Sequence, residues 1–184
     1  MEALLNLDGN ILIWIQEFLR NPILDPFFKM ITSLGNAGIF WIIATIFLLI
    51  PKRTRRVGMI SAFALICSLL INNILLKNLV ARTRPYYVVE GLIPLIKKPV
   101  EFSFPSGHAG SSLASACVLY RNLPKKYGIW FLVLAILISF SRLYVGVHYP
   151  SDVLAGAVTG IVCSYLGQWV VNRFFAETKD PKNT

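Results

Sequence analysis

The chain has 184 residues, of which 55% are hydrophobic and 15% are charged, and its mean hydropathy is +0.62. This composition is too apolar for an ordinary soluble domain and indicates a protein of the lipid bilayer. The formal net charge is +9, but much of the positive excess stands in short clusters at the ends of apolar runs, which favours a membrane topology over a nucleic-acid partner.

The first predicted element is a stretch of apolar residues at helical spacing, residues 8–33. The pairs Asn21-Pro22 and Asp25-Pro26 interrupt it, because the residue before a proline disfavours the helical conformation. The stretch is therefore predicted to form either an interfacial amphipathic helix pair or a broken sixth membrane span.

Five apolar runs follow, and each is predicted to cross the membrane with help from its flanking residues, since a spanning helix needs roughly 20 residues. The runs are residues 36–50, 57–76, 107–120, 127–143 and 153–172. The predicted fold is thus an all-α polytopic membrane bundle of five to six transmembrane helices. Residues 1–175 are predicted to form one domain, and the polar tail, residues 176–184, is predicted to be disordered.

Basic residues gather in three segments that five alternating spans place on one side of the membrane. The segments are residues 52–56, 121–126 and 173–182. The positive-inside rule makes that side cytoplasmic in a multi-pass protein of the cell membrane. Three polar motifs fall at the opposite helix ends, so a site built from them is expected to face the extracytoplasmic surface, although further lysines and arginines there weaken the contrast.

The only two histidines of the chain, His108 and His148, stand inside these polar motifs. The motifs are KNLVARTRP at residues 77–85, PSGH at 105–108 and SRLYVGVHYPSD at 141–152. Because histidine is so scarce here, its placement in two of the three motifs predicts a single active site.

The first and third motifs contain Lys77, Arg84 and Arg142, which the topology places at one membrane face. Charges near or within a membrane are costly enough to be functional candidates by default. Three fixed cations suit an anion with several oxygens, such as a phosphoryl group. The alternative is that each side chain only reaches to lipid headgroups.

The second motif directly precedes an apolar run, where a helix would present free backbone N–H groups. Ser106 is suited to the N-cap position, and Gly107 allows close approach of a ligand to the backbone. The motif is therefore a candidate anion cradle, and the alternative is an ordinary serine-capped helix.

In the third motif, His148 stands four residues before Asp152, and Pro150 is predicted to begin a helix. The Asp152 carboxylate can then reach back to one imidazole nitrogen and leave the other free, which makes His148 a candidate nucleophile. A purely structural histidine and aspartate pair is the alternative. A metal site is less favoured, because three nearby cations would repel a divalent ion.

The pattern KxxxxxxRP, PSGH and SRxxxxxHxxxD resembles the three-part signature of the type 2 phosphatidic acid phosphatase (PAP2) superfamily, in the same order and with the same internal spacing. The resemblance implies a helical bundle, hydrolysis of phosphomonoesters or diphosphates without a metal or other cofactor, and a phosphohistidine intermediate.

The resemblance also implies a role for each motif residue. His148 is similar to the attacking nucleophile, Asp152 to the group that orients it, and His108 to the general acid that later activates water. The residues expected to bind the phosphoryl oxygens are Lys77, Arg84, Ser106, Gly107 and Arg142.

The expected partner is a phosphorylated membrane lipid, with undecaprenyl pyrophosphate favoured narrowly over phosphatidylglycerophosphate, phosphatidic acid and the lipid A 1-phosphate. Residues 86–104 are expected either to lie along the interface and shape headgroup access or to be a plain connecting loop. Functions of other classes are a vanadate-dependent haloperoxidase and a non-catalytic lipid-binding protein. The oligomeric state stays open, because packing within the bundle explains the small residues Gly156, Gly160 and Ser164 as readily as dimerisation does.

Overall fold

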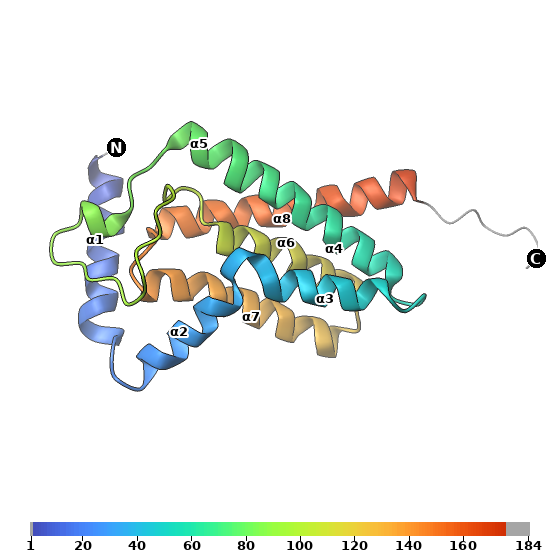
Figure 1. The fold of residues 1–184 in the computed structure, drawn as a ribbon, viewed down its shortest axis with the longest axis horizontal. Coiled ribbons are helices and arrows are strands. Elements are labelled where there is room, and N and C mark those ends of the chain that lie inside the picture. Colours follow the sequence, from blue (N-terminus) through green and yellow to red (C-terminus); the bar gives the residue numbers. More distant parts are fainter. Residues whose placement is uncertain (1, 176–184) are drawn as a thin grey trace, which may run out of the picture.

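The computed structural model describes residues 2–175, and the predicted disordered tail, residues 176–184, lies outside the described residues (Figure 1). Within this part of the chain all regular structure is helical, which confirms the all-α prediction. The helices are α1 (Glu2–Trp14), α2 (Leu24–Leu34), α3 (Ile39–Leu49), α4 (Arg55–Ser68), α5 (Lys77–Val80), α6 (Gly107–Asn122), α7 (Lys125–Tyr144) and α8 (Pro150–Phe174). Short π-helical stretches, Ile15–Leu19 and Leu69–Leu76, extend α1 and join α4 to α5.

Helix α6 is the centre of the bundle and packs against α4, α7 and α8. Small residues allow this packing. A Cβ atom on Gly156 of α8 would lie 2.4 Å from the Ser106 carbonyl oxygen, and one on Gly160 would lie 2.4 Å from that of Gly110. These two glycines therefore pack against α6 inside the bundle, so the small-residue ridge needs no second copy of the chain to explain it.

Three helical segments are long and apolar enough to cross a membrane, or four if α2 and α3, which meet at a bend of 47°, count as one broken span. The unbroken candidates are Arg55–Tyr87, Lys125–Tyr144 and Pro150–Phe174. The chain is thus a multi-pass membrane protein, but five to six spans are not confirmed. The predicted span 36–50 corresponds to α3, which contains only 11 residues and becomes a span candidate only together with the bent α2.

The predicted span 107–120 corresponds to α6, which has only 16 residues and is not among the span candidates. Its polar side chains face neighbouring helices rather than lipid. Ser112 Oγ accepts a hydrogen bond of 2.9 Å from Trp41 Nε1, and the hydroxyls of Ser115 and Ser61 lie 2.9 Å apart. Helix α6 can therefore be less apolar than the span candidates, because the other helices cover its polar side chains.

Helix α1 runs across one end of the bundle instead of along it (Figure 1). It is held there by Leu12, which is fully buried in a cluster with Leu92 and Tyr149. Residues 8–33 are thus divided between a crossing helix, α1, and a helix, α2, that pairs with α3. The break at residues 20–23 contains the first predicted interruption, Asn21-Pro22, whereas Asp25-Pro26 stands in the first turn of α2 and does not interrupt it.

The two ends of the bundle carry different residues. The turn from α3 to α4, the turn from α6 to α7 and the C-terminal end of α8 all lie at the right-hand end in Figure 1, and they carry the basic segments of the sequence. The ends of α5 and α7 and the starts of α6 and α8 lie near α1 at the other end. The three polar motifs therefore meet at one end, opposite the basic turns.

Candidate active site

The three polar motifs converge at helix termini. Lys77 begins α5, Ser106 caps α6, Arg142 stands in the last turn of α7, and Asp152 stands in the first turn of α8. The first residues of α6 and α8 are joined directly, because the Ser106 N–H donates to the Asp152 carbonyl oxygen over 3.0 Å. The fold thus assembles one site from segments that are far apart in the sequence.

His148 lies in the short loop before α8 and is only 2% exposed. Its Nδ1 atom lies 3.6 Å from Asp152 Oδ2, a contact longer than a hydrogen bond, and its Nε2 atom lies 3.3 Å from Arg84 Nη1. Since a guanidinium can only donate, Nε2 must carry the lone pair and Nδ1 the proton that faces the carboxylate. This tautomer leaves Nε2 as the nucleophilic nitrogen.

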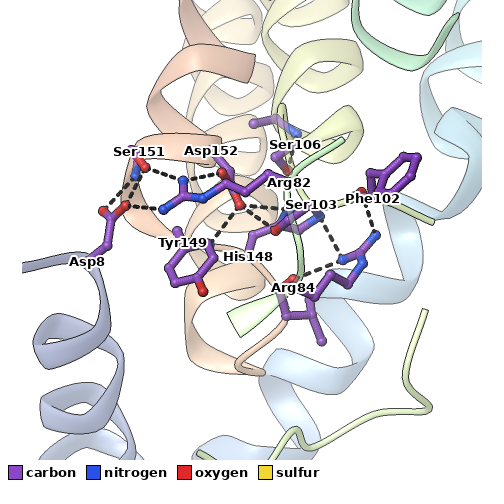
Figure 2. Close-up of polar contacts among 12 residues, drawn as sticks. Asp8, Arg82, Arg84, Phe102, Ser103, Ser106, His148, Tyr149, Ser151 and Asp152 are labelled. Atoms are coloured by element: carbon purple, nitrogen blue, oxygen red, sulfur yellow. Dashed lines mark hydrogen bonds and ion pairs between the residues drawn. The ribbon is translucent and has the colours of Figure 1, made fainter. Parts of the chain in front are cut away.

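Asp152 is fully buried, and its carboxylate is held by three donors (Figure 2). Ser103 Oγ donates to Oδ2 over 2.5 Å, the Tyr149 N–H donates to Oδ2 over 3.0 Å, and Arg82 Nη1 donates to Oδ1 over 2.7 Å. The start of α8 at Pro150 places the carboxylate in the first turn, near the imidazole. The carboxylate orientation is thus fixed before any ligand binds.

Arg84 is 4% exposed and is held by the backbone around it (Figure 2). Its Nε donates to the Glu101 carbonyl over 2.6 Å, Nη1 to that of Val147 over 2.9 Å, and Nη2 to that of Phe102 over 3.4 Å. With Nη1 also directed at His148, one N–H of Nη2 is left for an anion. Arg84 can therefore offer a phosphate only one N–H, because its other donors bind the backbone around it and His148.

Arg142 is 3% exposed and faces no carboxylate among the described residues. Its Nη1 donates to Thr32 Oγ1 over 2.6 Å, whereas its Nε has no hydrogen-bond partner in the described part of the chain. A buried cation without a counter-charge is costly, and an unmade hydrogen bond adds to that cost. An anion next to Nε would satisfy both requirements.

Lys77 is the one motif cation of the three that has a carboxylate partner among the described residues. Its Nζ lies 2.6 Å from Glu101 Oε2, and the Glu101 side chain is 66% exposed. The hydrogen bond and charge of Lys77 hold the pKa of Glu101 below its ordinary value. The predicted phosphate-binding role of Lys77 thus requires a ligand oxygen to compete with this exposed carboxylate.

The PSGH motif begins α6 as expected. Ser106 has extended backbone dihedrals, and its Oγ accepts a long contact of 3.5 Å from the Ala109 N–H. Gly107 has a further reason to be glycine, because a Cβ atom there would lie 2.7 Å from Asn73 Oδ1. The free N–H groups of this first turn face the end of the bundle where the other motifs meet.

His108 is held by the turn after α2, a segment that the sequence did not connect with the site. Its Nε2 lies 3.2 Å from Asn36 Oδ1, and a Cβ atom on Gly35 would lie 2.5 Å from its Cδ2. Lys77 and Arg142 act electrostatically on the same imidazole. The two histidines and the cations therefore belong to one site.

Five residues whose side chains contact those of predicted site residues were missed by sequence reasoning. They are Thr32, Asn36, Arg82, Glu101 and Ser103. Arg82 alone had a signal, since it stands inside the first motif two residues before Arg84. The other four are ordinary polar or charged residues whose positions only the fold reveals.

Protonation of His148 is predicted to require strong acid. Burial lowers the pKa of His148 to about 3, and the charges of Arg142 and Arg84 act in the same direction. A lowered pKa keeps the imidazole neutral at pH 7 and down to about pH 5. In nitrogen NMR spectra of the histidine-labelled protein, His148, assigned with His108→Gln, is expected not to titrate between pH 8 and 5. Arg84→Gln is expected to raise its midpoint, and a wild-type midpoint near the ordinary value would contradict the lowered pKa.

The geometry defines a class of protein before any comparison. A helical membrane bundle holds, at one end, a buried imidazole and carboxylate pair beside buried cations with a free donor, which suits an enzyme acting on a multi-oxygen anion. The sequence pattern of the PAP2 superfamily matches residues 57–176. The chain belongs to the PAP2 superfamily, and its enzyme class is that of a phosphatase.

The curated relatives are named as phosphatases of different lipids. The chain is 38% identical over 126 residues to an undecaprenyl-diphosphatase of Sulfolobus acidocaldarius, a match over 68% of this chain and 61% of that protein. It is 32% identical to undecaprenyl-diphosphatase BcrC of Bacillus subtilis, over 80% of this chain and 75% of that one. A lipid A 4'-phosphatase of Porphyromonas gingivalis is 28% identical, over 90% and 73%. The chain thus spans about three fifths of the Sulfolobus protein's length.

Solved structures share the fold. LpxE of Aquifex aeolicus superposes with a TM-score of 0.76 at 29% identity, over 87% of this chain and 93% of that one. A transmembrane PAP2 type phosphatidylglycerolphosphate phosphatase from Bacillus subtilis superposes with a TM-score of 0.74 at 27% identity, over 95% and 89%. The two superpositions cover 87% and 95% of this chain, so the helical bundle is a shared architecture.

Proposed function

We propose that this protein hydrolyses a phosphomonoester or diphosphate of a membrane lipid through a phosphohistidine at His148, with undecaprenyl pyrophosphate as the favoured substrate. The observation that carries the proposal is the buried Arg142, whose Nε lacks a partner among the described residues, in a site that also holds His148 Nε2, whose lone pair faces Arg84 Nη1 at 3.3 Å. A phosphoryl group supplies oxygens that can accept a hydrogen bond from Arg142 Nε and a phosphorus atom that His148 Nε2 can attack.

In the proposed first step, the lone pair of His148 Nε2 attacks phosphorus, and the bond from phosphorus to the leaving oxygen breaks. His108 gives that oxygen its proton. Asp152, 3.6 Å from Nδ1, stabilises the positive charge that the ring gains. Arg142, Arg84 and Lys77 would hold the phosphoryl oxygens, together with the Ser106 hydroxyl and the Gly107 N–H.

In the proposed second step, His108 accepts a proton from water, which attacks phosphorus as the bond to Nε2 breaks. Inorganic phosphate leaves, and His148 recovers its lone pair. The leaving lipid took one proton and the water returned one, so His108 ends as it began.

The surroundings of the site support a lipid substrate. The segment between Arg84 and Ser106 exposes apolar side chains, and Phe102, whose carbonyl binds Arg84, is 44% exposed. Lys98 lies 5.4 Å from the ring centroid of Tyr86 and 5.6 Å from that of Tyr87. Aromatic and basic side chains of this kind are typical of the membrane interface. We interpret this segment as interfacial, with the lipid tail beside it.

The remaining topology is part of the proposal. Residues 1–175 would form one membrane domain with five to six spans counting α6 and the bent pair, and the site would face the extracytoplasmic side. The support is the separation of the basic turns from the polar motifs at opposite ends of the bundle (Figure 1). A diphosphate exposed on that side by a polyprenyl lipid would reach the site without crossing the membrane.

The test is phosphate release from a panel of purified lipids by the protein in detergent micelles, with His148→Ala as the control. The panel contains undecaprenyl pyrophosphate, phosphatidylglycerophosphate, phosphatidic acid and a lipid A phosphate. We expect kcat/KM to be highest for undecaprenyl pyrophosphate. A preference for a monophosphate lipid would overturn the substrate, and halide oxidation by a vanadate-loaded protein without phosphate release would overturn the reaction.

Activity is predicted to be independent of divalent metal ions. Three cations of the protein surround the phosphoryl position and supply the charge that a metal would otherwise supply. Phosphate release from undecaprenyl pyrophosphate is therefore expected to be unchanged in excess EDTA. Assays at several EDTA concentrations control for metal ions that the diphosphate substrate itself binds. A strict requirement for Mg²⁺ would contradict the role of the cations.

A further inference from the structure

Arg82 is the residue through which the crossing helix α1 reaches the site. Its Nη1 donates to Asp152 Oδ1 over 2.7 Å and to Ser151 Oγ over 2.7 Å, and its Nη2 donates to Asp8 Oδ2 over 2.8 Å (Figure 2). The guanidinium carbon lies 3.8 Å from the ring centroid of Tyr149. The two carboxylates, the serine hydroxyl and the tyrosine ring together fix the position of the Arg82 guanidinium.

Asp8 is the second anchor of this arginine and comes from α1. It is only 3% exposed, accepts the Ser151 N–H at Oδ1 over 3.1 Å, and accepts the Ser151 hydroxyl at Oδ2. Ser151 stands in the first turn of α8, where a backbone N–H has no partner within its own helix. Asp8 therefore caps α8 from another helix and fixes the turn that carries Asp152.

The charges of the three side chains depend on one another. Asp8 and Asp152 are buried carboxylates, and Arg82 lies between them as a shared counter-charge. Removing Arg82 would leave two buried carboxylates without their counter-charge. The Asp152 carboxylate would also lose the donor on Oδ1 that keeps Oδ2 turned toward His148. Arg82 stands at an unspecified position of the pattern KxxxxxxRP, and Asp8 lies outside all three motifs.

We propose that Arg82 and Asp8 are positioning residues that act through Asp152, so that α1 forms part of the catalytic unit. The proposal rests on the proposed function, in which Asp152 orients His148. Partners that orient a ligand or base in this indirect way typically change activity about ten- to a hundredfold when they are removed.

The test is a double-mutant cycle with undecaprenyl pyrophosphate in detergent micelles. Arg82→Gln is expected to lower kcat by about ten- to a hundredfold with little change in KM, because the phosphate-binding groups stay in place. In an Asp152→Asn background the same change is expected to cost little more, since its target is already altered. Losses that multiply in the double variant would overturn the proposal, as they would show that Arg82 does not act through Asp152.

Asp8→Asn is a milder variant that keeps the side-chain size and one acceptor. It is expected to lower kcat less than Arg82→Gln and to have little effect when added to it. Arg82→Lys is expected to recover part of the loss, because it keeps the charge but cannot make both contacts at once. Should Arg82→Gln fail to fold, the Asp8→Asn and Asp152→Asn cycle decides the question in the same way.

Arg121→Gln is the matched control, because Arg121 also contacts a serine and a tyrosine ring of the α8 segment, at the opposite end of the bundle, but has no carboxylate partner among the described residues. Its Nη1 donates to Ser164 Oγ of α8 over 3.1 Å, and its guanidinium carbon lies 4.2 Å from the Tyr165 ring centroid. Arg121→Gln is expected to leave kcat unchanged even if it lowers the melting temperature. A loss of kcat equal to that of Arg82→Gln would overturn the proposal, because it would assign both effects to bundle stability.

A second measurement separates failure of this proposal from failure of the proposed function. Wild-type phosphate release with an inactive His148→Ala establishes the function independently of Arg82. If no lipid of the panel is hydrolysed, nitrogen NMR still reports changes in the surroundings of the two imidazole rings. Arg82→Gln is expected to alter the His148 signal and not that of His108, and an unchanged His148 signal would overturn the positioning role.

Discussion

His148→Ala is expected to abolish phosphate release from every lipid that the wild-type protein hydrolyses. The imidazole supplies the nucleophile of the proposed first step, and Nε2 is the atom to which phosphorus would bind. The cations proposed to bind phosphate remain, so the variant is expected to bind lipid with an affinity close to that of the wild type. The measurement is phosphate release in micelles together with binding of the same lipid.

A trapping experiment distinguishes nucleophilic loss from a general loss of structure. With p-nitrophenyl phosphate, whose leaving group needs no proton donor, acid-labile phosphoprotein is expected in wild type quenched early and none in His148→Ala. His108→Ala is expected to accumulate phosphoprotein, since it lacks the base that activates water. Phosphoprotein in His148→Ala at the wild-type level would assign the intermediate to another residue.

Arg142→Ala is expected to lower kcat by roughly a hundred- to a thousandfold, the effect of losing about 3 to 4 kcal/mol of transition-state stabilisation. The reason is the position of its Nε, a buried donor without a partner in the described part of the chain, which is available to a developing negative charge. The measurement is kcat with saturating lipid. Turnover near that of the wild type would remove Arg142 from the site.

The same residue carries an opposite expectation for stability. Arg142 is 3% exposed, faces no carboxylate in the described range, and makes one side-chain hydrogen bond, to Thr32. Replacing it by the similarly long but neutral methionine removes a buried charge at the cost of that bond. Arg142→Met is therefore expected to melt at or above the wild-type temperature while its kcat falls, which is the pattern of a residue retained for function.

The sequence predicted which polar residues the fold brings together better than it predicted the membrane topology. The residues that carry charge or a lone pair were recognisable because they are rare in an apolar chain, and two histidines among 184 residues left little choice. The number of spans was harder to predict, because hydropathy does not distinguish lipid-facing residues from those covered by other helices. Helix α6 shows the difference, since its serines bind Trp41 and Ser61 inside the bundle.

Residues that only position the candidate site residues were not recognisable from the sequence. Ser103 reaches Asp152 across 49 positions, and Asp8 reaches Ser151 across 143. Neither stands at a characteristic spacing from its partner, so no local pattern marks it. Glu101 was missed for the same reason, although it lies 2.6 Å from Lys77 and changes what that lysine can offer a phosphate.

The sequence by itself determined that the protein lies in a membrane, that it is helical, and which side chains are candidates for chemistry on a phosphoryl group. These properties depend on residue type and on spacing along a helix, which are local. Only the tertiary structure decided that α1 lies across the end of the bundle, that Arg82 joins Asp8 to Asp152, and that the buried Arg142 Nε has no partner among the described residues. Those properties depend on which distant groups share a low-dielectric space, where a charge or a hydrogen bond must find its partner.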